Sequence, residues 1–286
     1  MGMKLRPSDI DPLIDAALEE DMPAGDITSE SIISTKSESR AVFLAKEAGV
    51  LAGLEVARRV FQRLDPGVRF RALFRDGGAF EAGDILGEVR GRSLSLLKGE
   101  RTALNFLQRM SGIATKTHQF VAAVAGTKTK ILDTRKTTPT LRRLEKYAVR
   151  MGGGENHRSS LSEMVLIKDN HLALAGSISD AVRKARKSVG PGIAIEVEVA
   201  DFAAAKEAVA AGADRIMLDN MPLNRMRPVV RWLKDKVPVE VSGKVSLSRA
   251  RSIAELGVEY ISVGGLTHSF NSVDISLEFK QGRPHA

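Results

Sequence analysis

The chain of 286 residues contains no cysteine. This absence excludes disulfides, thiolate metal sites and cysteine nucleophiles, and it fits a cytoplasmic protein. Aromatic residues make up 5% of the chain, which leaves few side chains to stack on nucleic-acid bases. No apolar run reaches the roughly 18 residues of a membrane span, and the charged N-terminal stretch lacks the apolar centre of a signal peptide. Neither a membrane nor a nucleic-acid partner is therefore expected.

What the chain has instead is an excess of positive charge, with 43 Lys and Arg residues against 35 Asp and Glu and a net charge of +8. The basic residues are scattered along predicted helices rather than massed in a tail. Small anionic substrates are the partners that this pattern favours. The length suits two domains, and a hydrophobic content of 43% is enough to build a core.

The second half of the chain has a regular alternation of short apolar strands and amphipathic helices. Strands are expected over residues 130–134, 164–168, 194–199, 215–219, 239–243 and 260–265. Alternating strands and helices predict parallel pairing with helical crossovers. Six strands are fewer than the eight of a closed barrel, so the pattern alone leaves an incomplete barrel and an open doubly wound sheet as alternatives.

The first part of the chain is predicted to be a mixed unit of helices and half-buried strands. Residues 10–20 have the spacing of an amphipathic helix, and residues 40–91 contain alternating strands around one helix. Residues 93–126 are predicted to be mostly helical, with Ser111 and Gly112 ending one helix before another begins.

Polar residues and glycines gather at or just past the ends of the predicted parallel strands. They are Arg135, Lys136, Lys168, Glu198, Asp219, Ser242, Gly243, Gly264 and Gly265. In a barrel these ends converge on one mouth, where the active sites of that fold lie. The basic residues there, with His157 and Arg158 in a connection, can hold a dicarboxylate and a diphosphate. Glu198 and Asp219 can bind ribose hydroxyls or Mg²⁺, and the glycine-containing strand ends can cradle a phosphate.

Five short sequences carry a resemblance to a known family: TRKTTP from Thr134, GGGENH from Gly152, HR from His157, LIKDNH from Leu166, and ERTALNFLQRMSGIAT from Glu100. Together they resemble quinolinate phosphoribosyltransferases, the nicotinate-nucleotide pyrophosphorylases of NAD synthesis. The resemblance implies an α/β fold with an open, incomplete parallel α/β barrel beside an N-terminal α+β sandwich domain. It places the sandwich domain at residues 1–115 and the barrel at 116–269, with a C-terminal helix at about 270–282 that packs back on the first domain.

The same resemblance implies a reaction and a set of site residues. The reaction is transfer of phosphoribosyl from 5-phosphoribosyl-1-pyrophosphate to quinolinate with loss of CO2, assisted by Mg²⁺. The catalytic residues implied are Arg101, Arg135, Lys136, His157, Arg158, Lys168, Glu198 and Asp219. The substrate-binding residues implied are Thr134, Ser242, Gly243, Lys244, Val263, Gly264, Gly265 and His268. Glu198 and Asp219 are the implied Mg²⁺ site, directly or through water or ribose.

Arg101 differs from the other site residues because it lies on a helix of the first domain. It is not at the end of a parallel strand, so its position in the sequence does not place it at the mouth of the barrel. The resemblance implies a homodimer in which Arg101 enters the partner's site; whether dimers assemble further is left open. Two positions depart from the family pattern. The segment SSLSE, from Ser159 through Ser160 to Glu163, replaces the usual glycine and Asp, and Lys244 stands where a second glycine is common.

Three other functions are compatible with parts of the sequence. A sister family associated with molybdate transport loci shares much of the layout, although LIKDNH and EKYAVRMGGGENH favour the quinolinate enzymes. Lys168 at a strand end is also where a barrel aldolase would place a Schiff-base lysine. A non-catalytic basic binding protein would instead predict salt-sensitive retention of nucleic acid.

Overall fold

The computed structural model describes residues 5–280, which form two compact units. The first unit takes the chain up to His118, together with residues 137–153 and the segment from Ser269 onward. The second unit takes residues 119–136 and 154–268. The segment 137–153, which interrupts the second unit in sequence, therefore groups with the first unit.

The first unit is built on an antiparallel four-stranded sheet in the order β12-β1-β5-β3. These strands are β1 (Glu38–Ala45), β3 (Arg69–Ala72), β5 (Ile85–Arg92) and β12 (Ile275–Lys280), and β2 (Gly49–Val50) and β4 (Ala79–Phe80) form a separate small ladder. The helices are α1 (Pro7–Asp21), α2 (Ile27–Ile32), α3 (Leu54–Leu64), α4 (Ser93–Ala123, whose last turn belongs to the second unit) and α5 (Arg142–Met151).

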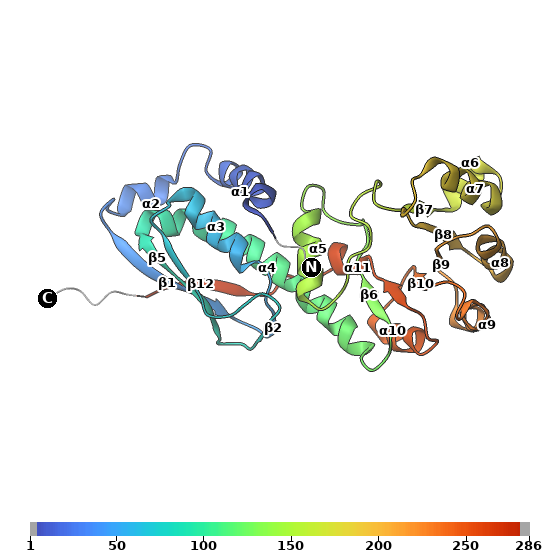
Figure 1. Ribbon diagram of the computed structural model, residues 1–286. Coiled ribbons are helices and arrows are strands. Elements are labelled where there is room, and N and C mark those ends of the chain that lie inside the picture. Colours follow the sequence, from blue (N-terminus) through green and yellow to red (C-terminus); the bar gives the residue numbers. More distant parts are fainter. Residues whose placement is uncertain (1–4, 281–286) are drawn as a thin grey trace. The chain divides into compact units, whose positions relative to one another are not determined.

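Helices α3 and α4 lie across one face of this sheet (Figure 1). Phe43 of β1 meets Phe61 of α3 edge to face, with 6.2 Å between ring centroids. Gly99 of α4 lies so close to Phe61 that a Cβ atom there would be 2.8 Å from the ring. Helix and sheet therefore share one apolar core, and the predicted α+β sandwich is confirmed.

The predicted C-terminal helix is wrong, because the segment is strand β12. It pairs antiparallel with β1, from Arg40 opposite Lys280 to Ala45 opposite Ile275. The sequence ISLEFK has the two-residue period of a strand, with Ile275 and Leu277 buried and the residues between them more exposed. Residues 281 and 282 of the predicted helix lie outside the described residues.

The predicted break in the long helix is also wrong, because α4 continues through Ser111 and Gly112. Ser111 Oγ accepts a hydrogen bond from the backbone N–H of Ala52, at 3.1 Å. A Cβ atom on Gly112 would lie 2.1 Å from the carbonyl oxygen of Asn271. These small residues allow another segment to approach the helix closely, so they reflect packing and not helix termination.

The second unit is built on a parallel six-stranded sheet in the order β6-β11-β10-β9-β8-β7. The strands are β6 (Lys130–Leu132), β7 (Val165–Ile167), β8 (Ile195–Val199), β9 (Arg215–Asp219), β10 (Val239–Ser242) and β11 (Tyr260–Ser262). All six coincide with predicted strands. Within the described residues β6 and β7 do not pair with each other, so the sheet is open and the predicted incomplete barrel is confirmed.

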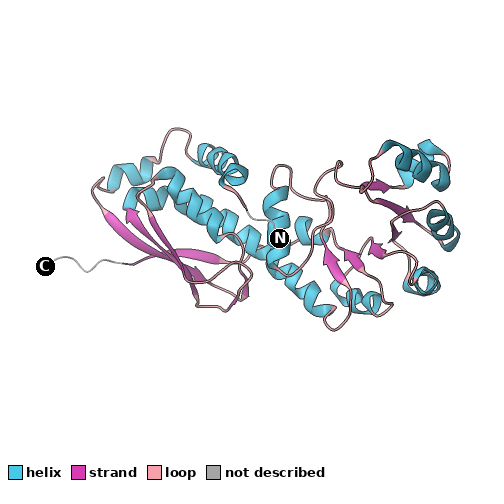
Figure 2. Ribbon diagram, viewed as in Figure 1, coloured by secondary structure: helices cyan, strands magenta, loops and turns pink. Residues whose placement is uncertain are grey.

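Helices connect the parallel strands and lie outside them (Figure 2). The connecting helices are α6 (Asp169–Ala175), α7 (Ile178–Ser188), α8 (Phe202–Ala210), α9 (Leu223–Leu233) and α10 (Leu247–Ala254), and the short α11 (Gly265–His268) follows the last parallel strand. The strand register brings Asp219 beside Ser242. Polar residues at the strand ends thus meet at one edge of the sheet. No helix in the described part of the chain is both long and apolar enough to cross a membrane.

The close approach at Gly112 yields a prediction about stability. Gly112→Ala should lower the free energy of unfolding by about 3 kcal/mol, because the new methyl group meets a backbone carbonyl that has little freedom to move. Thermal unfolding followed by circular dichroism measures the loss. Gly190→Ala is the matched control, since no atom lies within 4 Å of its Cβ position. Equal melting temperatures for the two variants would contradict this account of the helix.

Candidate functional site

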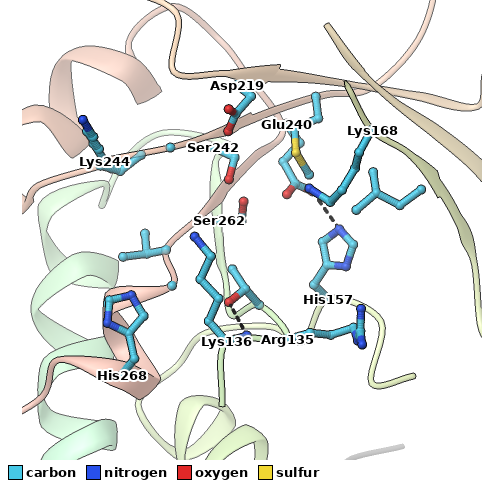
Figure 3. A pocket seen from close by; sticks show the side chains of 18 of the residues that line it. Arg135, Lys136, His157, Lys168, Asp219, Glu240, Ser242, Lys244, Ser262 and His268 are labelled. Atoms are coloured by element: carbon cyan, nitrogen blue, oxygen red, sulfur yellow. Dashed lines mark hydrogen bonds and ion pairs between the residues drawn. The ribbon is translucent and has the colours of Figure 1, made fainter. Parts of the chain in front are cut away.

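A cavity of about 580 Å³ opens at the C-terminal ends of the parallel strands. Its lining consists of Thr134, Arg135, Lys136, His157, Arg158, Leu166, Lys168, Met217, Asp219, Glu240, Ser242, Gly243, Lys244, Val245, Ser262, Val263, Gly264, Gly265 and His268. Figure 3 shows Lys136 and Lys168 directed toward the same space from different strand ends, whereas the Lys244 side chain extends away from it. The structure thus brings together almost all of the predicted site residues.

Two predicted residues do not line this cavity. Glu198, on β8, contacts a lining residue, because the Lys168 ammonium donates to its carboxylate at 2.6 Å. Arg101 belongs to the first unit, where its side chain is exposed on α4.

The loop after β6 is organised by the buried carboxylate of Asp133. It accepts hydrogen bonds from the backbone N–H of His157 at 2.9 Å and from the Asn156 side chain at 2.5 Å. An isolated parallel bridge between Leu132 and Glu155 extends the edge of the sheet. These bonds fix the start of the segment that carries His157 and Arg158 into the cavity.

Lys136 is held on both sides by threonine hydroxyls. Thr134 Oγ1 accepts from its backbone N–H at 3.0 Å, and Thr267 Oγ1 donates to its carbonyl at 2.8 Å. A Cβ atom on Gly264 would lie 2.9 Å from Lys136 Cδ and 3.2 Å from His268 Nε2. Glycine at this position therefore leaves room for both side chains.

The cations in the cavity act on one another. Arg158 Nη1 donates to the carbonyl of Met164 at 2.8 Å. Burial lowers the pKa of Arg158 from its ordinary value, and the nearby positive charge of Arg135 lowers it further. The arginines and lysines give the cavity a positive potential that suits a ligand with several negative charges.

The turn after β10 requires backbone conformations in which most side chains are strained. Gly243 has φ +87°, and a Cβ atom there would lie 2.7 Å from the backbone nitrogen of Asn220. Lys244 follows at φ +47°, in the left-handed region that favours glycine. Lys244 stands where the family commonly has a second glycine, and its backbone keeps the conformation that glycine would adopt there.

The prediction missed a buried acidic pair, Glu196 of β8 and Glu240 of β10, of which Glu240 also lines the cavity. Each side chain is 0% exposed. His157 Nε2 is 3.0 Å from Glu196 and 3.5 Å from Glu240, and Arg215 is 3.2 Å from Glu240. The spacing could have revealed one of them. Glu196 lies two residues before Glu198 on the same strand and so points to the same side of the sheet.

Burial raises the pKa of Glu196 to about 7, which Arg215 partly opposes. The pKa of Glu240 is also raised to about 7, first by burial and then by the charge of Glu196.

The metal-binding capacity of the site is modest. Among the described residues, one group of His and acidic side chains brings its possible metal-ligand atoms within 4.8 Å of one another. It consists of His157, Glu196 and Glu240. In the predicted pair, Glu198 is engaged by Lys168, and Asp219 accepts from the Asn220 amide at 2.5 Å. Mg²⁺ commonly binds through one or two carboxylates together with substrate phosphates, and Asp219 in the cavity fits that mode.

Comparisons with known proteins cover both units. The family models for the quinolinate phosphoribosyl transferase N-terminal and C-terminal domains match residues 26–111 and 113–278. A probable nicotinate-nucleotide pyrophosphorylase (carboxylating) of Bacillus subtilis is 44% identical over 259 residues, which are 91% of this chain and 89% of the relative.

A quinolinate phosphoribosyltransferase (decarboxylating) of Nicotiana tabacum is 38% identical over 289 aligned residues, covering 94% and 82% of the two chains. The crystal structure of NadC from Streptococcus pyogenes superposes with a TM-score of 0.94 at 42% identity, covering 98% of this chain and all of that one.

The buried acidic pair predicts a dependence of stability on pH. Because the folded-state pKa of Glu240 is raised to about 7, the folded protein binds more protons than the unfolded chain between about pH 4.5 and 7. This contribution to stability therefore falls as pH rises through that window. Glu240→Gln should remove this pH dependence. Its free energy of unfolding should exceed that of wild type by about 1–3 kcal/mol at pH 8, and by less at pH 5.

Urea denaturation followed by the fluorescence of the single tryptophan, Trp232 in the second unit, measures this gain. The exposed Glu255→Gln is the matched control and should show no such difference between the two pH values. A gain for Glu240→Gln that is equal at pH 5 and pH 8 would contradict the assignment.

Proposed function

The chain belongs to the quinolinate phosphoribosyl transferase family, and from that premise we propose the reaction that it catalyses. It transfers phosphoribosyl from 5-phosphoribosyl-1-pyrophosphate to quinolinate, and it releases pyrophosphate and CO2. The product, nicotinate mononucleotide, enters NAD biosynthesis. The observation that carries the proposal is the convergence of arginines and lysines with glycine-containing strand ends and a carboxylate in one cavity.

The acceptor half of the cavity is its basic side. Arg135 and Arg158 lie between β6 and β7, and Lys168 directly follows β7. These three cations can pair with the two carboxylates of quinolinate. A planar guanidinium matches a carboxylate bidentately, whereas a lysine acts as a compact charge. The pKa of Arg158, lowered by burial and by Arg135, indicates a cation whose charge a bound anion would stabilise.

The donor half is formed by the ends of β9, β10 and β11. Backbone N–H groups of residues 242–244 and 264–265 can hold the 5-phosphate, and Lys136, Lys244 and His268 line the same space. Asp219 and Glu198 would bind the ribose hydroxyls, or Mg²⁺ bound to the diphosphate. Mg²⁺, when bound, would neutralise the charge that develops on the leaving diphosphate.

The reaction needs binding and electrostatics more than a nucleophilic side chain. The pyridine nitrogen forms a bond to the anomeric carbon as the bond to diphosphate breaks. The ring, now cationic, accepts the electron pair left when the 2-carboxylate departs as CO2, and that carbon then takes up a proton. The residues contribute by holding both substrates in line and by stabilising their charges. A Schiff-base mechanism is less favoured, since the Lys168 amine is held in an ion pair with Glu198.

Acceptor selectivity tests the proposed function. Nicotinate has one carboxylate, so it would leave partly buried cations without a partner, at a cost of about 1–3 kcal/mol. Its kcat/KM should be about 5- to 160-fold below that of quinolinate. Phthalate is the control compound: it has both carboxylates but no ring nitrogen, and it should inhibit without turnover. Equal turnover of nicotinate and quinolinate would contradict the assignment.

The role of Asp219 is tested by separating the two substrates. Asp219→Asn should raise KM for the donor about tenfold, while calorimetry gives a Kd for quinolinate within about twofold of wild type. Asp201→Asn, a change just after β8 and outside the cavity lining, is the matched control. Loss of quinolinate binding with an intact donor site would reverse the two halves assigned here.

We further propose a homodimer in which Arg101 completes the partner's site, because it lies in the first unit and no strand end carries it. Arg101→Ala and Arg135→Ala should each be nearly inactive. After subunit exchange, about half of the dimers carry one site with both changes and one site with neither, which restores about a quarter of wild-type activity.

The matched control for this exchange is a mixture of Arg135→Ala with Lys136→Ala. Both changes lie in one unit, so every site in a heterodimer keeps one of them and no activity should return. If native mass spectrometry confirms exchange and the Arg101 mixture also stays inactive, Arg101 does not act in trans.

A further inference from the structure

The His157 ring is hydrogen-bonded through both of its nitrogen atoms. Nδ1 lies 2.8 Å from the backbone nitrogen of Arg158, and Nε2 lies 3.0 Å from Glu196 Oε2. The ring is buried, and in Figure 3 it points toward Glu240 at the floor of the cavity. A histidine so placed does not simply extend a charged N–H toward a ligand.

These two bonds fix the tautomer of the ring. A backbone N–H can only donate, so Nδ1 must carry a lone pair and accept from Arg158. The proton of a neutral imidazole then lies on Nε2, which donates to Glu196. His157 is therefore neutral with its proton on Nε2, although the prediction had counted it among the cations.

Two carboxylates near the ring would favour its charged form, and a neighbouring cation offsets them. Glu196 on β8 and Glu240 on β10 both face Nε2, and Arg215 on β9 reaches Glu240 at 3.2 Å while lying over the ring of Tyr260 on β11. Arg215 thus supplies a positive charge to the acidic pair from below. Because Arg215 offsets the negative charge of the acidic pair, His157 can remain neutral.

The contacts form a chain that leads to one arginine. Glu196 accepts from His157, and His157 accepts from the backbone of Arg158. The guanidinium of Arg158 is held in turn by the carbonyl of Met164. Both the backbone and the side chain of Arg158 are therefore fixed before a ligand arrives, which lowers the entropic cost of binding.

We propose that Glu196 is a positioning residue: by accepting from His157 Nε2–H it holds the ring in the neutral tautomer whose Nδ1 anchors Arg158 for an acceptor carboxylate. This inference rests on the proposed function for the identity of that acceptor. The tautomer itself depends only on the contacts of His157.

Nuclear magnetic resonance of the wild-type protein labelled with ¹⁵N-histidine tests the tautomer directly. The His157 signals are assigned by their loss in His157→Asn. The expected result is an unprotonated Nδ1 and a protonated Nε2 across about pH 6 to 8, the range in which free histidine titrates. An imidazolium, or a proton on Nδ1, would overturn the proposal.

A matched pair at Glu196 tests the positioning role. Glu196→Gln keeps an acceptor oxygen for Nε2–H and should leave the Kd for quinolinate within about threefold of wild type, whereas Glu196→Leu removes the acceptor and should weaken binding about tenfold. The Kd for the donor should change by less than about twofold in both variants. Equal effects of Gln and Leu on quinolinate binding would overturn the role.

A second pair, at His157, tests which ring nitrogen matters. The side-chain oxygen of Asn can take the place of Nδ1, whereas the side-chain end of Gln reaches the place of Nε2. His157→Asn should therefore bind quinolinate more tightly than His157→Gln, and the reverse order would contradict the chain of contacts. If wild type binds no quinolinate, the proposed function fails, while the tautomer measurement still decides the state of His157.

Discussion

Positive charges crowded at one end of a sheet repel each other, and this site depends on how that repulsion is offset. The structure offsets part of it with carboxylates. Lys168 is paired with Glu198, and the acidic pair of Glu196 and Glu240 is bound to Arg215 through Glu240. The remaining positive potential is available to a ligand. An anionic substrate would complete the balance of charge in the cavity.

The parallel sheet makes this arrangement possible. Its strand ends lie at one edge, so short loops bring cations from β6 and β7 opposite the acidic and glycine-containing ends of β9, β10 and β11. Glycine is needed where these loops come close. Gly243 meets the backbone of Asn220, and Gly264 leaves space for Lys136 and His268. The backbone at these positions serves the site as much as the charged side chains do.

Much of the second unit was predictable because its strands are apolar runs separated by amphipathic helices. That pattern located all six strands, and the strand-end rule located most residues of the cavity. Whether the sheet closed could not be read from the pattern. Openness depends on the pairing partners of the edge strands, which are distant in sequence, and here the family resemblance indicated the right answer.

The errors have a common physical source, since each concerns a contact between distant segments. Gly112 looked like the end of a helix, but it accommodates the backbone of Asn271. The C-terminal strand looked helical until its partner β1 was known. Glu240 is an isolated acid in an apolar strand, and its role emerges only when His157 and Arg215 lie beside it.

The most direct test of the account is a single-turnover experiment with quinolinate labelled with ¹³C in the 2-carboxylate. If the cavity acts by holding two anionic substrates, labelled CO2, pyrophosphate and nicotinate mononucleotide should appear in equal amounts, and mass spectrometry should find the protein unmodified after borohydride treatment. Retention of the label in the nucleotide product, or a covalent adduct on Lys168, would contradict the account.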